Sequence, residues 1–128
     1  MLALTIAVGA LAGLVLGAAY YVTAPNVPAY AGHRAPDRPL AAVLFVEFVR
    51  SLAIAAVTAY LLVSGGVSGM IEGALLGLAL WAVAAALLAG TVFHEGTSKR
   101  GAALDVGDWL VRLVAIGAII GGLIRYFA

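Results

Sequence analysis

Four long apolar runs constrain this chain more than any other feature of its sequence. They cover residues 2–23, 40–63, 70–93 and 103–124. Each run approaches or exceeds the roughly 20 residues that an α-helix needs to cross about 30 Å of hydrocarbon. A backbone in lipid must satisfy its own hydrogen bonds, and the runs lack strand-like alternation, so they predict helices and not a β-barrel. We therefore expect an all-α membrane protein, a four-transmembrane-helix bundle in a single domain of residues 1–128.

Composition agrees with this class and excludes others. The 128 residues are 65% hydrophobic and only 10% charged, whereas ordinary soluble domains are about 45–50% apolar. The formal net charge of +1 leaves no basic face for nucleic acid, and the absence of cysteine excludes disulfides and thiol chemistry. No lysine or arginine precedes Arg34 and the first run exceeds a signal-peptide core, so we expect it to remain as a transmembrane helix.

The connections between the runs predict an orientation. Residues 24–39 hold four prolines, residues 64–69 form a short glycine-rich turn, and residues 94–101 are polar. The first and third connections share one side and are basic, whereas the other side carries only Arg125; the basic residues are Arg34, Arg38, Lys99 and Arg100. Basic connections stay in the cytoplasm. We therefore expect a multi-pass protein of the bacterial inner membrane with both termini outside the cytoplasm.

Charged residues inside two of the runs form the candidate site. Asp108 and Arg112 are four residues apart in the last run, and Glu47 and Arg50 are three apart in the second. Each pair can form a local ion pair on one helical face. An arginine at the bilayer centre costs at least about 3 kcal/mol, and charges in such places often mark substrate or ion pathways.

These four residues therefore predict a substrate or ion site near the midplane. Arg50 and Arg112 are expected to face one cavity that holds an anionic group or headgroup, while the acids could exchange protons or cations. The alternative is that two ion pairs lock the helices together, each contributing little net stability because desolvation opposes the Coulomb attraction.

An internal repeat is suggested by the register of the arginines. A shift of 62 positions places Arg38 on Arg100 and Arg50 on Arg112, so that the second arginine of each pair lies at a similar depth. Repeats of two helices related by an axis along the membrane normal occur in small transporters. We expect a tandem repeat of two helix hairpins, although the acids of the two halves do not align.

Small residues recur at the spacing that lets membrane helices approach closely. We expect this helix-packing role for Gly9, Gly13, Gly17, Gly73, Gly77, Gly117 and Gly121. Packing within one chain is the preferred use. A homo-oligomer stays open because four short helices enclose little interior of their own.

Nothing in the sequence assembles an enzyme site. His33 and His94, both expected in connections, lack the acids or cysteines that usually complete a metal site. Residues 96–101 lack the Gly-Lys-Ser/Thr ending of a phosphate loop, and no Ser/His/Asp arrangement occurs. We predict no enzyme, no metal and no cofactor. A membrane enzyme acting on lipid would need a cavity that opens toward headgroups.

Short motifs resemble a known family. They are Gly73-Ala-Leu-Leu-Gly-Leu-Ala-Leu-Trp81, Gly107-Asp-Trp109-Leu-Val and Gly117-Ala-Ile-Ile-Gly121, with Gly17-Ala-Ala-Tyr-Tyr21 and Pro25 in the first half. In these segments the chain resembles the bacterial membrane family called domain of unknown function 1761. The resemblance implies a four-helix integral membrane protein and brings no activity.

The function that these observations favour is a small transporter or channel-like protein with a charged midplane site. Its partners would be the lipid bilayer and a small solute or ion, with no nucleic acid. The alternative is a non-transporting membrane subunit or scaffold whose buried charges fix helix packing. The sequence does not identify a substrate.

Overall fold

A computed structural model describes residues 1–23, 39–95 and 99–127 and contains four helices and no strand within them. The helices are α1 (Leu2–Thr23), α2 (Leu40–Ser64), α3 (Met70–Glu95) and α4 (Lys99–Phe127). All four are long and apolar enough to cross a membrane. The predicted all-α fold with four membrane-spanning helices is therefore confirmed, while the internal repeat stays a prediction.

Two helices extend beyond the predicted bounds at their polar ends. Helix α3 continues to Glu95, so His94 lies in its last turn, and the prediction that His94 lies in a connection was wrong. Helix α4 begins at Lys99, earlier than the predicted residue 103, and ends at Phe127, later than the predicted residue 124. The reason is that an apolar run measures the hydrocarbon crossing, whereas helical hydrogen bonds continue beyond it. The predictions for Arg34, Arg38 and His33 lie outside the described residues.

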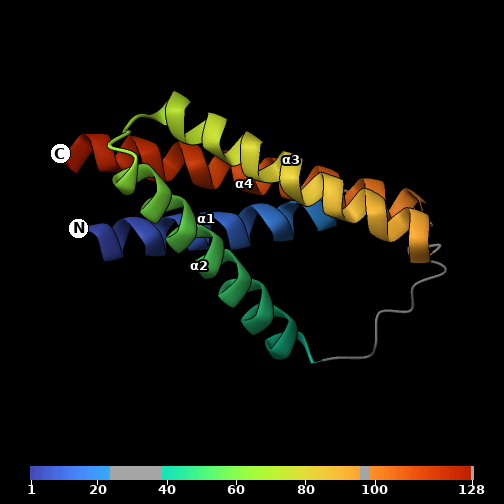
Figure 1. Ribbon diagram of the computed structural model, residues 1–128. Coiled ribbons are helices and arrows are strands. Elements are labelled where there is room, and N and C mark those ends of the chain that lie inside the picture. Colours follow the sequence, from blue (N-terminus) through green and yellow to red (C-terminus); the bar gives the residue numbers. More distant parts are fainter. Residues whose placement is uncertain (24–38, 96–98, 128) are drawn as a thin grey trace.

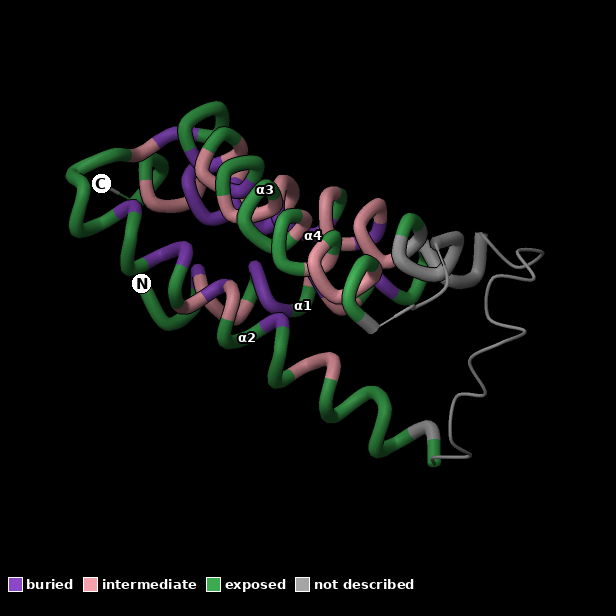
Figure 2. The backbone as a smooth tube through the Cα atoms, turned by 45° about the vertical axis from the view of Figure 1, so that its right-hand side comes forward, coloured by how far each residue is buried: buried purple, intermediate pink, exposed green. Residues whose placement is uncertain are grey.

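Helix α4 is the central element of the bundle. It packs against each of the other three helices, most extensively against α3, and α2 also packs against α1 (Figure 1). Helices α2 and α3 meet at their connection and then diverge, so that the first half of α2 leaves the bundle (Figure 1). The exposed residues 41–46 mark this departure (Figure 2). Both termini and the α2–α3 connection lie at the same end.

Glycines bring the backbones of α3 and α4 into contact. A Cβ atom on Gly73 would collide with the carbonyl of Gly117, and one on Gly77 would collide with the carbonyl of Leu113. The Gly69 N–H donates a hydrogen bond of 2.9 Å to the carbonyl of Gly121. Because backbone atoms cannot move aside as side chains do, any larger residue at Gly73 or Gly77 would push the two helices apart.

A second glycine stripe fixes α1 against α4. Three contacts join the helices at four-residue intervals in antiparallel order, namely Gly9 with Ile120, Gly13 with Ile116, and Gly17 with Arg112. The side chains on α4 therefore occupy the space that the glycines of α1 leave free. The buried apolar core lies around the first two contacts and consists of Ala10, Ala55, Ala59, Leu62, Ile116 and Ile120.

The short α2–α3 connection depends on glycine conformations. Gly66 and Gly69 have φ angles of 65° and 139°, which residues with a Cβ atom rarely adopt. The tight turn predicted for residues 64–69 is therefore built on two backbone positions that favour glycine. It keeps α2 and α3 close at this end, and the space between them opens only farther along the helices.

Candidate functional site

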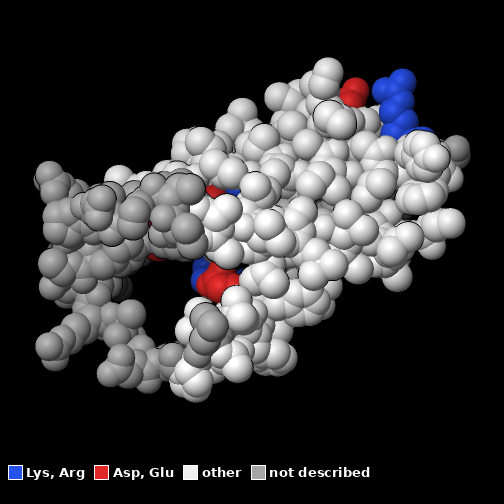
Figure 3. Space-filling model, turned by 180° about the vertical axis from the view of Figure 1, so that it is seen from behind, with Lys and Arg blue, Asp and Glu red and all other residues white. Residues whose placement is uncertain are grey.

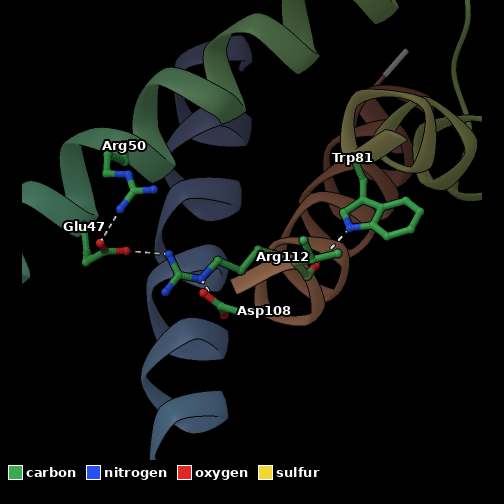
Figure 4. A network of polar contacts seen from close by, with 6 residues as sticks. Glu47, Arg50, Trp81, Asp108 and Arg112 are labelled. Atoms are coloured by element: carbon green, nitrogen blue, oxygen red, sulfur yellow. Dashed lines mark hydrogen bonds and ion pairs between the residues drawn. The ribbon is translucent and has the colours of Figure 1, made fainter. Parts of the chain in front are cut away.

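The four charged residues predicted as a site form one connected network between α2 and α4 (Figure 4). Arg112 donates hydrogen bonds through Nε to Oδ1 of Asp108, at 3.0 Å, and through Nη1 to Oε2 of Glu47, at 2.6 Å. Arg50 donates through Nη1 to the other oxygen of Glu47, Oε1, at 2.8 Å. The sequence predicted the two local pairs, and the structure adds a third bond, between Glu47 and Arg112, that joins them.

The exposed fraction of the side chains rises along this network from Arg112 and Asp108 to Arg50. The side chains of Arg112 and Asp108 are each only 2% exposed, that of Glu47 is 23% exposed, and that of Arg50 is 50% exposed. The Asp108–Arg112 pair is thus sealed inside the bundle, while Arg50 reaches a surface. Charges on the same network therefore have different access to anything outside the protein.

Trp109 joins both arginines. The Arg50 Cζ atom lies 4.6 Å from the centroid of the Trp109 ring, and the Arg112 Cζ atom lies 4.8 Å from it. A guanidinium over an indole ring is attracted by the negative charge of the ring face. Sequence reasoning did not assign Trp109 to the site, although its position next to Asp108 could have suggested it.

Helix α1 closes the network from the other side. A Cβ atom on Gly17 would overlap the Arg112 guanidinium, which therefore fills the space beside this glycine. Arg112 consequently contacts three helices, through Gly17 of α1, Glu47 of α2 and Asp108 of α4. This arrangement buries the cation with two carboxylates, as a charge in an apolar interior requires.

A groove of about 730 Å³ lies beside the network, between α2, α3 and α4. Arg50, Asp105 and Trp109 line it together with Thr91 and apolar side chains. The prediction that Arg50 and Arg112 face one cavity was wrong for Arg112, which does not line the groove. Its two carboxylate partners and the backbone at Gly17 hold its guanidinium inside the bundle. The two guanidinium groups nevertheless converge on the same carboxylate and the same ring.

The charged atoms of the network lie deep within the apolar spans. At about 1.5 Å per residue, Arg50 lies about 14 Å along α2 from Ala41, where its span begins, and Arg112 about 10 Å along α4 from Asp105. From behind, acidic and basic atoms lie next to each other in an otherwise mostly uncharged surface (Figure 3). Both arginines thus lie in the part of the protein that hydrocarbon would surround.

Trp81 ties α3 to the same part of α4. Its indole Nε1 donates a hydrogen bond of 2.9 Å to the backbone carbonyl of Val106, two residues before Asp108 (Figure 4). The bond helps to fix the register of α3 on α4 beside the network. Within the described ranges, no three His, Asp or Glu side chains gather as metal ligands would.

The chain matches a known family over most of its length. A family model described as protein of unknown function (DUF1761) matches residues 4–121. Neither the curated proteins nor the solved structures include a match to the chain. The matched range spans the whole charge network and all of the glycine contacts described above.

Proposed function

Since the chain belongs to the DUF1761 family, whose function is unknown, we propose a function from the site itself. The protein is a small transporter or channel-like membrane protein, and its solute passes along the groove between α2, α3 and α4. Arg50 is the residue that meets the solute. Glu47 holds Arg50 in place through their ion pair, and Glu47 and Asp108 together balance the charges of Arg50 and Arg112.

The exposure of Arg50 within an apolar span carries this proposal. An arginine in hydrocarbon is costly unless it is paired, hydrated or close to the interface. Arg112 has two carboxylate partners and is buried, whereas Arg50 has one carboxylate partner and leaves half of its side chain exposed to the groove. Water, an ion or a polar group in the groove would solvate that exposed half.

The groove lies toward the end of the bundle at which α2 and α3 diverge. Helices α2 and α3 meet at their connection and diverge toward the other end, and the apolar core fills the bundle beside Leu62 and Ile120. These observations support a state in which solute reaches Arg50 from one side of the membrane. We place that side in the cytoplasm of a bacterial inner membrane, because the basic residues Lys99 and Arg100 begin α4 at that end.

Cysteine labelling tests the proposal without knowledge of the substrate. The chain contains no cysteine, so each introduced thiol is unique. Ala84→Cys places a thiol in the groove, and Val83→Cys places one on the neighbouring residue, which is 61% exposed but outside the groove. Ala53→Cys and Leu52→Cys form a second matched pair on α2.

A hydrated groove makes the two groove thiols react with a membrane-impermeant sulfonated thiol reagent. The two control thiols face lipid, where the reactive thiolate does not form, and they stay unlabelled. If Ala84→Cys and Ala53→Cys are as unreactive as their neighbours in proteoliposomes, the groove is dry and the transport proposal is wrong.

The second candidate is a scaffold or non-transporting subunit, and the sealed position of Arg112 favours it. This residue connects three helices without access to the groove. A scaffold would keep both groove thiols unreactive, and it would depend on Arg112 for folding and for assembly with a partner or a second copy. The labelling experiment therefore separates the two functions directly.

A further inference from the structure

Most of the groove wall is apolar and accessible from the side of the bundle. Helix α3 contributes Leu80, Ala84, Leu87 and Leu88, and helix α2 contributes Ile54 and Val57. Leu87 is 71% exposed, so the outer edge of this wall, at Leu87, would lie against lipid in a membrane. A fully polar solute would find few hydrogen-bond partners along such a wall. The wall suits a molecule that has an apolar part of its own.

Two opposite charges interrupt the apolar wall. Arg50 enters the groove from α2, and Asp105 enters it from α4. The Arg50 guanidinium lies over Trp109, which follows Asp105 by four residues, or about 6 Å along the helix axis. The groove therefore presents a cation from α2 and an anion from α4.

Arg50 keeps hydrogen-bonding capacity for a ligand. A guanidinium has five N–H donors, and the bond with Glu47 uses one of them. Arginine binds phosphate oxygens well because its donors match their geometry. A phosphate in the groove can thus bind Arg50 without breaking the Glu47–Arg50 ion pair.

The pair of charges selects among headgroups. A headgroup with only a negative charge would be repelled by the Asp105 carboxylate. A headgroup with only a positive charge would be repelled by the Arg50 guanidinium. A headgroup that carries a phosphate and an ammonium complements both residues. The groove volume of about 730 Å³ falls within the roughly 300–1,000 Å³ of common small-molecule sites, and acyl chains can extend through the open side into the bilayer.

On the basis of the proposed transport function, we infer that the transported molecule is a zwitterionic phospholipid. Its phosphate binds Arg50, its ammonium binds Asp105, and its chains stay beside Leu87 at the outer edge of the groove and in the surrounding lipid. The headgroup moves along the groove while the chains remain in hydrocarbon. The protein would thereby lower the cost of carrying a charged headgroup through the bilayer interior.

A lipid translocation assay tests this inference. The purified protein is reconstituted into phosphatidylethanolamine and phosphatidylglycerol vesicles with a trace of phosphatidylethanolamine that carries a fluorescent label on one acyl chain. A reductant added outside bleaches only the outer leaflet, so continued bleaching measures movement between leaflets. We expect wild-type protein to move the label, and Arg50→Leu to slow it by about tenfold or more through loss of a charge-assisted bond. Arg125→Leu, in the exposed last turn of α4, leaves the rate unchanged.

The headgroup preference gives a second measurement that does not depend on the folding of Arg50→Leu. Wild-type protein moves chain-labelled phosphatidylethanolamine faster than chain-labelled phosphatidylglycerol, and Asp105→Asn removes most of that difference. Equal wild-type rates for the two lipids would overturn the inference. Uptake of soluble glycerophosphoethanolamine without lipid movement would also overturn it, because the same headgroup would then be recognised free of its chains.

Failure of this inference differs from failure of the proposed function. If the groove thiols react with the water-soluble reagent and neither lipid moves, the lipid assignment is wrong and transport of another solute remains. If the thiols are unreactive and neither lipid moves, both proposals are wrong.

Discussion

Gly17 of α1 and Arg112 of α4 lie in direct contact, and the guanidinium occupies the space that a side chain at position 17 would need. The same helical faces bring Gly13 to Ile116 and Gly9 to Ile120 one and two turns away. On the face of α4 that packs against the glycines of α1, Arg112 thus takes a position equivalent to those of Ile116 and Ile120. Its charge is accepted there because Asp108 and Glu47 reach its other side.

Gly17→Ala should therefore displace the Arg112 guanidinium from its carboxylates. We expect the free energy of unfolding to fall by about 3 kcal/mol, since overpacking and a disturbed buried ion pair act together. The measurement is denaturant unfolding in detergent. Gly90→Ala is the matched control, because a Cβ atom there meets nothing within 4 Å. Equal stability of the two variants would contradict the contact.

Gly73→Ala should separate α3 from α4. The added methyl group meets the Gly117 carbonyl, which is part of a helix backbone and cannot rotate away. We expect a loss of about 1–3 kcal/mol in unfolding free energy, as for other overpacked positions. Gly122→Ala adds a methyl group 3.8 Å from Met70, an ordinary contact, and should change stability little. A loss as large at Gly122 as at Gly73 would show that the tight backbone contact is not the cause.

Arg112→Leu and Arg50→Leu should have unequal effects on stability. Removing Arg112 leaves two acids near each other without their shared cation, and loss of one partner from a buried pair costs about 3–5 kcal/mol. Arg50 is half exposed, so its replacement should cost less than about 1 kcal/mol. Thermal unfolding of both variants measures the difference. The double variant Asp108→Asn with Arg112→Leu should regain part of the stability that Arg112→Leu loses. If it regains none, the unpaired carboxylate of Asp108 is not the cause of the loss.

Trp81→Phe should weaken the attachment of α3 to α4 without changing the apolar surface much. The phenylalanine ring cannot donate to the Val106 carbonyl, so we expect a loss of about 1 kcal/mol. Chemical unfolding measures it, with Phe93→Leu, at an 84% exposed position, as the control. An unchanged stability for Trp81→Phe would mean that the indole hydrogen bond contributes nothing net.

Local features of this protein were predictable from its sequence. The four helices follow from apolar runs long enough to cross hydrocarbon. The Glu47–Arg50 and Asp108–Arg112 pairs follow from spacings of three and four residues, which place both partners on one helical face. These inferences need only the geometry of a single helix.

Features that join separate helices were not predictable. The Glu47–Arg112 bond and the convergence of both arginines on Trp109 depend on how far α2 is shifted along α4, which the sequence of either helix alone does not specify. The internal repeat in the sequence predicted that Arg50 and Arg112 lie at similar depths in the membrane. It did not predict that Arg50 is exposed and Arg112 is buried. That difference arises because α2 leaves the bundle at its first half, while α4 lies between α1 and α3.

Glu47 uses its two oxygens for arginines on different helices. Arg50 travels with Glu47 because both belong to α2, whereas Arg112 stays with α4. Any rocking of α2 away from α4 must therefore break the Glu47–Arg112 bond and can leave the Glu47–Arg50 bond intact. In such a movement Glu47 would stay with Arg50, and Asp108 would become the remaining counterion of the buried Arg112.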